Sequence, residues 1–405
     1  MAVGLAIVEI GLGVAAACSP RVKDLLASPR GTGAIPMTLP DEHLEQRLNP
    51  AFPGHDRRGY RNPVALEHAQ IVALGDSQTY GVHVEAGDAW PSQLASLTGR
   101  TVYNMGVSGY GPVHSLMLWR EAMQLQPKVV IEAFYAGNDL FDSFNLVYNN
   151  HQHEELKSPD LQLQSDVRAA EKNQPIKDHV ARLLHMGKAE GAAPRARPVP
   201  GGDSASLREW FAARSHVYGL LRRVAFEVSS WRSTSGQSAA ADWQDARAFA
   251  AAHPEYCQVF EHGIGRTVLT SEYRLAALDQ GDPRISEGLS ISLQAINRMS
   301  QAARTDGVRF VVLMLPTKER VVGDLWTSPT PSFRSLMLNE TQAWDRAERY
   351  FAENDIEYID ALPALQGQWT TGGQPYPVSK DGHPNREGHA AIARAVSDYL
   401  GSHGG

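Results

Sequence analysis

Residues 71–81 read IVALGDSQTYG, and this stretch decides the fold that we expect for the chain. Ile71 to Leu74 form a short continuous apolar run that Gly75 closes, a pattern typical of a strand buried on both faces of a parallel sheet. The polar segment that follows lies where such a strand gives way to a helix, and the chemistry of open α/β sheets gathers at this edge. We therefore expect the folded body to begin near Gln70.

Four further apolar runs resemble the first, and each is preceded by a segment that can be helical. Apolar residues recur at helical spacing from Leu289 to Ala303 and again from Ile392 to Tyr399. Strands that alternate with helices predict an α/β fold, a doubly wound sheet with right-handed crossovers. The four runs are residues 101–103, 129–134, 308–315 and 356–359.

The composition is that of a soluble globular protein with a large core. Of 405 residues, 42% are hydrophobic and 20% are charged, which excludes a disordered or fibrous chain. The formal net charge of −7 argues against a nucleic-acid partner, which calls for a basic stripe. Cys18 and Cys257 are the two cysteines and form no CxxC motif, which argues against a disulfide framework and a zinc knuckle.

Composition also divides the chain into three parts. Residues 1–18 are apolar apart from Glu9 and predict an N-terminal anchor or signal-like segment, barely long enough to cross a bilayer of roughly 30 Å. Residues 19–66 are polar and contain proline, which predicts a linker with short elements. Residues 67–405 form the folded domain, with a large insertion after the third strand at about 142–286. We expect a loop at 191–202 within this insertion and helical patches at 210–228 and 239–252.

The apolar N-terminus leaves three alternatives open. A helix that tethers the protein to a membrane is the one we favour, and it places the protein outside the cytoplasm. Lipidation at Cys18 is the second, because Ala15 to Cys18 loosely resemble a lipoprotein cleavage site. A buried or disordered terminus is the third. The run lacks the basic residues that begin a signal peptide, so we expect no cleaved signal unless the native start has been cut back.

Two residues suit nucleophilic catalysis. Ser77 follows the first strand and begins the next helix, where free N–H groups and the helix dipole can stabilise an oxyanion. His383 stands beyond the last strand and just before the last helix, so it can act as the base that a serine needs. Pro384 favours an extended His383, and Asn385 can cap the helix. The alternatives are a turn with a helix cap at Ser77 and a surface loop at His383.

Candidate oxyanion donors follow the second and third strands. Residues 104–109 read NMGVSG, and their glycines allow backbone N–H groups to approach a ligand closely. Asn138, in residues 136–139 (AGND), offers a neutral amide that can reach the same point. Each segment taken alone can be only a turn. Together they bring a nucleophile, donors and a base to one edge of the sheet.

These four blocks resemble the SGNH hydrolase superfamily, also called GDSL esterases and lipases. GDSQTYG matches the nucleophile block at Ser77, NMGVSG the glycine donor at Gly109, AGND the asparagine donor at Asn138 and DGHPN the base at His383. The resemblance implies a flavodoxin-like three-layer sandwich with a parallel sheet of about five strands. It also implies a Ser-His-Asp mechanism with no metal and no cofactor, and an oxyanion hole that includes the Ser77 N–H.

The acid of the triad departs from the family pattern. The family usually places it three residues before the histidine, where this sequence has Lys380, whereas Asp381 lies two residues before His383. Residues i and i+2 of an extended segment point to the same side, and Gly382 adds freedom, so we predict that Asp381 is the acid. The alternative is that a backbone carbonyl orients His383. Asp76, beside the nucleophile, is expected to be structural.

Three function classes remain open. The first is an esterase that acts on an acylated carbohydrate or lipid, with Lys318 after the fourth strand as a candidate substrate-binding cation. The second is an O-acyltransferase that uses the same serine on a cell-envelope polysaccharide, since the insertion resembles that of membrane-tethered bacterial members related to polysaccharide acetyl-transfer proteins. The third is a non-catalytic glycan-binding module. We expect a location in the bacterial periplasm or cell envelope, with a cytoplasmic location as the alternative, and predict no oligomeric state.

Overall fold

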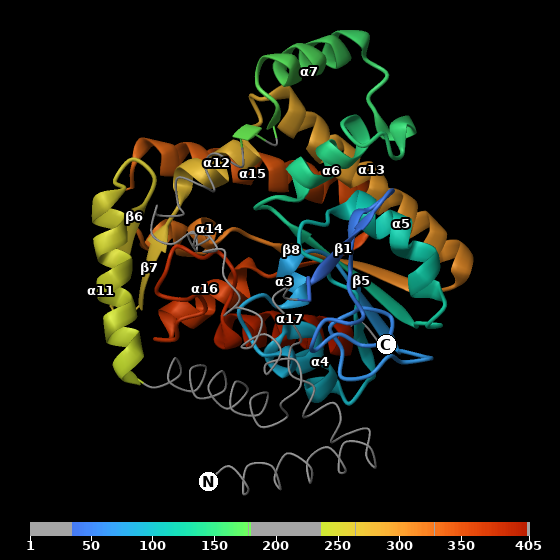
Figure 1. Ribbon diagram of the computed structural model, residues 1–405, viewed down its shortest axis with the longest axis horizontal. Coiled ribbons are helices and arrows are strands. Elements are labelled where there is room, and N and C mark those ends of the chain that lie inside the picture. Colours follow the sequence, from blue (N-terminus) through green and yellow to red (C-terminus); the bar gives the residue numbers. More distant parts are fainter. Residues whose placement is uncertain (1–34, 177, 180–235, 264, 328, 403–405) are drawn as a thin grey trace, which may run out of the picture. The chain divides into compact units, whose positions relative to one another are not determined.

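The computed structural model describes residues 35–176, 178–179, 236–263, 265–327 and 329–402 (Figure 1). The described residues between 38 and 179 and between 245 and 402 belong to one compact unit. The expected anchor at 1–18, the loop at 191–202 and the helical patch at 210–228 lie outside the described residues. Within the described part, no helix has the length and apolar character needed to cross a bilayer.

A five-stranded parallel sheet forms the centre of the larger unit, as expected. Its strand order is β4-β3-β5-β8-β9, the order of a flavodoxin-like sheet. Ile71 lies opposite Val102 on one side and Val129 on the other, and Val129 lies opposite Arg309. The strands are β3 (Ile71–Leu74), β4 (Val102–Asn104), β5 (Val129–Tyr135), β8 (Arg309–Leu315) and β9 (Glu357–Asp360).

Helices cover both faces of this sheet and complete a three-layer arrangement (Figure 1). On one face, Ile71, Ile131 and Leu313 share a buried cluster with residues of α4, α16 and α17. The other face is covered by α5, α6 and α13, which bury a second cluster between them. The helices of the two faces are α4 (Trp90–Thr98), α5 (Pro112–Met123), α6 (Asp139–Tyr148), α13 (Pro283–Asp306), α16 (Leu362–Thr370) and α17 (Arg386–Ser402).

Shorter elements connect these layers, and one long helix flanks them. The long helix α15 (Pro331–Glu353) stacks Trp344 on Phe134 of β5, with ring centroids 5.4 Å apart. The nucleophile candidate Ser77 begins α3, which has four residues. The short elements are α3 (Ser77–Tyr80), α12 (Ser271–Leu278), α14 (Lys318–Val322) and the 3-10 helices η1 (Ala86–Asp88), η2 (Glu154–Leu156) and η3 (Gly323–Leu325).

The segment expected as a linker with short elements is described from residue 35 to residue 66, and this part packs on the folded body. Strands β1 (Thr38–Asp41) and β2 (Glu45–Leu48) form an antiparallel hairpin, and the segment after it is anchored by buried polar groups. Asp56 accepts a 2.6 Å hydrogen bond from the Tyr103 hydroxyl, and Asn62 bonds both the N–H and the C=O of Asn104. The folded body therefore begins before Gln70, because the polar side chains of this segment find partners on β4.

The insertion after β5 contains more regular structure than its composition indicated. Helix α11 (Gly236–Ala252) confirms the patch expected at 239–252, and β6 (Gln258–His262) pairs with β7 (Gly265–Leu269) in a hairpin. Helix α7 (Leu161–Asn173) precedes them. Thr267 of β7 donates its hydroxyl hydrogen bond to the C=O of Pro377 at 2.8 Å. The end of the insertion thus supports the segment that carries His383.

Candidate functional site

Ser77 stands on a tight turn between β3 and α3. Gly75 adopts a φ of +139°, and a Cβ there would lie 2.6 Å from the Thr79 hydroxyl, so the turn requires glycine. Asp76 caps α3, because its carboxylate accepts the N–H of Gln78 at 2.8 Å, and this agrees with the structural role expected for it. The turn leaves the Ser77 hydroxyl at the carboxyl edge of the sheet.

The structure brings three of the predicted site residues into one hydrogen-bonded array. Nε2 of His383 lies 2.8 Å from Oγ of Ser77, a residue 306 positions away. Nδ1 of His383 lies 2.7 Å from Oδ1 of Asp381, which also accepts the backbone N–H of His383 at 2.8 Å. The spacing of two residues therefore suffices for the carboxylate to reach the imidazole. The order Ser–His–Asp is that of a nucleophile, a base and an orienting acid.

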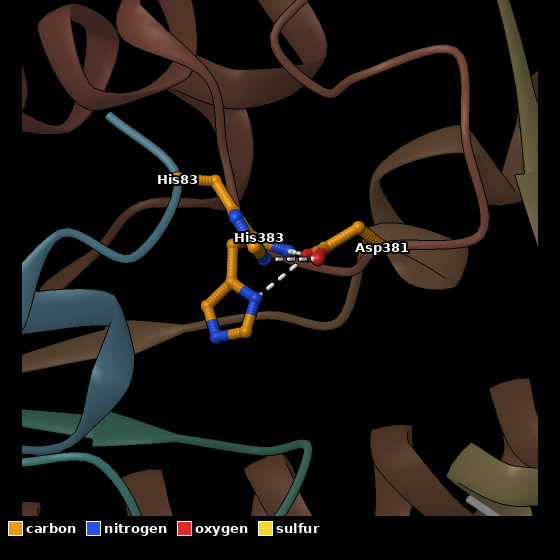
Figure 2. Close-up of side chains that lie close together, drawn as sticks. All are labelled: His83, Asp381 and His383. Atoms are coloured by element: carbon orange, nitrogen blue, oxygen red, sulfur yellow. Dashed lines mark hydrogen bonds and ion pairs between the residues drawn. The ribbon is translucent and has the colours of Figure 1, made fainter. Parts of the chain in front are cut away.

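A second histidine contacts the same carboxylate (Figure 2). Nε2 of His83 lies 2.8 Å from Oδ2 of Asp381, so the carboxylate lies between two imidazoles. The ligand-type atoms of His83, Asp381 and His383 lie within 4.8 Å of one another. We interpret the group as part of the hydrogen-bonded array, since one nitrogen of each imidazole bonds the carboxylate. His83 was not singled out from the sequence. The one feature that could have pointed to it is its position, six residues after Ser77.

The carboxyl groups near Ser77 fall into two electrostatic classes. Burial raises the pKa of Asp76 and raises that of Asp139 well above its usual value. Burial also acts on Asp381, but hydrogen bonds from His383 and His83 outweigh it and hold the pKa of Asp381 well below its usual range. Environments that push carboxyl pKa values apart assign them different tasks. Asp381, the carboxyl group whose pKa is lowered, is thus the one that contacts His383.

Lys318 supports the segment before His383 through hydrogen bonds to its backbone. Its Nζ donates hydrogen bonds to the C=O groups of Val268, Ser379 and Asp381 at 2.6, 3.0 and 2.8 Å. The expected role of Lys318 as a substrate-binding cation at the edge of the cleft does not match this position, because the side chain is 0% exposed. Burial lowers the pKa of Lys318 to about 8. The sequence around Lys318, residues 315–318 (LPTK), suggested a surface charge. In the structure, β7 and residues 379–381 enclose the ammonium group.

Arg274 of α12 is a further residue that the sequence did not reveal. A Cβ on Gly382 would lie 2.2 Å from a guanidinium nitrogen of Arg274, so the segment packs directly on this cation. Arg274 also donates to the C=O of Gly137 at 3.2 Å. It therefore joins the turn after β5 to the segment that carries Asp381 and His383.

Two backbone N–H groups at the site have no acceptor within the described part of the protein. They belong to Ser77, at the first position of α3, and to Gly109, whose φ is +80°. The loop of Gly109 is fixed by β2, because Gln46 donates its side-chain amide to the C=O of Ser108 at 2.9 Å. Tyr110 donates its hydroxyl back to the C=O of Gln46 at 2.5 Å. The hairpin of β1 and β2 thus positions this loop.

Asn138 precedes the first residue of α6, and its amide already has acceptors. Its Nδ2 lies 2.5 Å from Oδ2 of Asp142 and 3.5 Å from Oδ1 of Asp139. The side chain is therefore held at the strand edge by the first turn of α6. An amide nitrogen carries two N–H groups, so one can stay with Asp142 while the other meets a ligand oxygen.

Solved structures of other proteins resemble this one at low sequence identity. A lipolytic protein of the G-D-S-L family from Desulfitobacterium hafniense DCB-2 is 12% identical with a TM-score of 0.35, over 82% of this protein and 100% of that one. A catalytic mutant of an acetylxylan esterase from Geobacillus stearothermophilus is 10% identical with a TM-score of 0.36, over 83% and 96% of the two proteins. A search of the curated proteins found no match.

The family model of GDSL-like lipases and acylhydrolases matches residues 73–254. This range contains the nucleophile turn with Ser77, the loop of Gly109 and the residue Asn138. The hydrogen-bonded array adds His383 and Asp381, which lie outside the matched range. Residues 73–254 are therefore similar to GDSL-like lipases and acylhydrolases, and this similarity, together with the array of Ser77, His383 and Asp381, supports a hydrolase of carboxylic ester bonds.

Proposed function

We propose that the protein is a serine esterase that removes short-chain acyl groups from an acylated carbohydrate or lipid. The observation that carries this proposal is the hydrogen-bonded order of Ser77, His383 and Asp381, with contacts of 2.8 and 2.7 Å. A serine with its base at hydrogen-bond distance, and the base oriented by a carboxylate, is the arrangement that activates a hydroxyl for attack on an ester.

The reaction proceeds through an acyl-enzyme. His383 Nε2 accepts the proton of Ser77 as Oγ attacks the ester carbonyl carbon, and Asp381 stabilises the imidazolium that forms. The imidazolium then protonates the leaving alcohol oxygen as the ester C–O bond breaks. In the second half, His383 takes a proton from water, which attacks the acyl carbon. The acid is released, and Ser77 regains its proton from His383.

Three donors stabilise the negative oxygen of the tetrahedral intermediates. Two are the backbone N–H groups of Ser77 and Gly109, which have no acceptor among the described residues. The third is the Asn138 amide, which can hold Asp142 with one N–H group while the other meets the oxyanion. Donors fixed before the reaction act strongly because they need not reorganise as charge develops.

A panel of p-nitrophenyl esters of increasing acyl length tests this function. The wild type is expected to turn over the shortest esters fastest, and Ser77→Ala to lose roughly four to six orders of magnitude in kcat. A fluorophosphonate should label Ser77 alone. Labelling of another serine, or full activity of the variant, contradicts the proposal. A second arm with a free sugar as acceptor measures whether the acyl group passes to the sugar instead of to water.

The apolar run at residues 1–18 supports a second proposal, which concerns location. We propose that the protein works outside the cytoplasm, in the periplasm or cell envelope, tethered to a membrane through this run. An ester of a cell-envelope carbohydrate or lipid is then within reach of the catalytic unit.

A further inference from the structure

Each oxygen of the Asp381 carboxylate meets one imidazole. Oδ1 faces Nδ1 of His383 at 2.7 Å, and Oδ2 faces Nε2 of His83 at 2.8 Å (Figure 2). The Asp381 side chain is 27% exposed. Without His83, the contact that fixes Oδ2 within the described residues is lost, and the carboxylate can turn about its Cβ–Cγ bond. The second imidazole therefore defines the plane in which the carboxylate meets His383.

The backbone around His83 is fixed. His83 has a φ of +65°, in the left-handed region that is uncommon for residues other than glycine. Arg61 donates to the C=O groups of Tyr80 and Val84 at 3.2 and 2.7 Å and also bonds the C=O of Gly81. The guanidinium thus holds the backbone on both sides of His83. A left-handed residue persists where its surroundings impose it, and functional sites are the usual place.

His83 also joins the two halves of the site. It lies on the segment that leaves α3, whereas Asp381 comes from the segment before α17. Apart from the bond between Ser77 and His383, the bond between His83 and Asp381 is a direct link between the nucleophile turn and the base segment. A hydrogen-bond donor at position 83 therefore affects both the orientation of the Asp381 carboxylate and the distance between the two segments.

We propose that His83 is a positioning residue, whose neutral Nε2–H holds Asp381 for His383 and whose protonation weakens the support that Asp381 gives to the imidazolium of His383. This proposal rests on the esterase function proposed above. A neutral imidazole donates one hydrogen bond and leaves the negative charge of Asp381 to His383. A protonated His83 competes for that charge, so the imidazolium formed during the reaction is less stable.

The charges around this array determine how it titrates. The hydrogen bond to Asp381 raises the pKa of His83, and the His83 side chain is 66% exposed to solvent. Lys318 and Arg274 lie behind Asp381, and the ring of His383 lies 5.8 Å from that of His83. The pKa of Lys318 is about 8 and that of Arg274 is raised further above its usual value, so both cations are charged at acidic pH. Lys318 and Arg274 therefore keep their charge while His83 gains a proton on the acidic side.

The test is the pH profile of kcat/KM for His83→Ala and His83→Gln, each normalised by fluorophosphonate titration of Ser77. We expect His83→Ala to lower kcat about 10- to 100-fold at pH 8, the effect of losing a hydrogen bond to a charged group, with KM within twofold. His83→Gln restores kcat to within about threefold, because its amide donates where Nε2–H did. On a plot of log kcat/KM against pH, we expect the acidic limb of the wild type to have a slope greater than one. The slope should be one in His83→Gln, since glutamine does not titrate.

Two controls separate the possible failures. His68 is exposed and makes no contact with the described residues of the site, so His68→Ala should match the wild type. Ser77→Ala tests the esterase function itself, and activity in that variant would overturn the function together with the inference. If Ser77→Ala is inactive but His83→Ala keeps wild-type kcat and slope, the positioning role alone is overturned. A His83→Gln variant as slow as His83→Ala would also overturn it.

Discussion

The Nζ of Lys318 donates a 2.8 Å hydrogen bond to the backbone C=O of Asp381, so a buried ammonium group holds the residue that orients His383. The same ammonium bonds the C=O groups of Val268 and Ser379. One cation thereby ties the end of β7 to the segment before the base. The catalytic arrangement depends on a side chain that no substrate touches.

Lys318→Met is expected to reduce both stability and turnover. The variant leaves three C=O groups without their donor, and loss of hydrogen bonds to a charged group costs about 1.5–3 kcal/mol each at most. Urea unfolding should show the lower midpoint, and kcat per titrated site should fall because residues 379–381 lose their support. Lys172→Met, at an exposed position of α7, is the matched control and should change neither quantity.

Asp381→Asn separates two ways of orienting His383. The 2.7 Å contact of Oδ1 with Nδ1 leads us to expect a loss of up to about ten-thousandfold in kcat, because an amide neither holds the reactive tautomer nor stabilises the imidazolium. Steady-state kinetics on a short acyl ester measure this. If a backbone carbonyl orients His383 instead, the loss stays below roughly tenfold.

Asn138→Ala tests the third oxyanion donor. Loss of one such donor typically costs about a hundred- to a thousandfold in kcat, with little change in substrate affinity. A variant that keeps kcat and loses affinity would assign Asn138 to substrate binding. Asp142→Ala is the informative partner, because it removes the acceptor 2.5 Å from the Asn138 amide. We expect this variant to retain kcat, since the amide becomes free to meet the oxyanion.

Stability should depend on pH through Glu340. This carboxyl accepts the N–H and the hydroxyl of Thr317, which precedes Lys318, and burial raises the pKa of Glu340 to about 7. Between about pH 4.5 and 7 the folded protein keeps a proton that the unfolded protein releases. The contribution of Glu340 to the free energy of unfolding therefore falls as the pH rises through this window, by up to about 3 kcal/mol, and is constant outside it. Glu340→Gln should flatten the curve in urea titrations at pH 4.5, 6 and 7.5.

Cell fractionation tests the proposed location. The full-length native gene is expressed, and the membrane, periplasmic and cytosolic fractions are probed for the protein. We expect it in the membrane fraction, facing away from the cytoplasm and accessible to added protease. Unprocessed protein recovered in the cytosolic fraction would count against a tether at residues 1–18.

The sheet was predictable because its signal is local. A strand buried on both faces is a continuous apolar run, so the run at 71–74 coincides with β3, and the run at 129–134 matches β5 within one residue. The cap at Asn385 was equally local, and its Oδ1 does accept the N–H of Glu387 at 2.9 Å. Parallel topology then places the strand ends, and their polar residues, at one edge.

The missed features depend on partners that are distant in the sequence. Lys318 reads as a surface charge until β7 encloses it, and Arg274 has no motif around it. His83 depends on a left-handed backbone that Arg61 holds from outside the motif. The hairpin of β1 and β2 has few apolar residues. Its polar contacts with the loop of Ser108 leave no periodic pattern in the sequence.

The pairing of β5 with β8 has a consequence for how this architecture can change. The two strands are neighbours in perfect register, yet the whole insertion separates Tyr135 from Arg309 along the sequence. The entropy lost on closing a flexible loop grows only with the logarithm of its length, about 0.6 kcal/mol for each doubling. The stability of the sheet therefore depends little on the number of residues between these two strands. Residues can therefore be added to or removed from that passage as long as β7 and Arg274 still support the segment that carries His383.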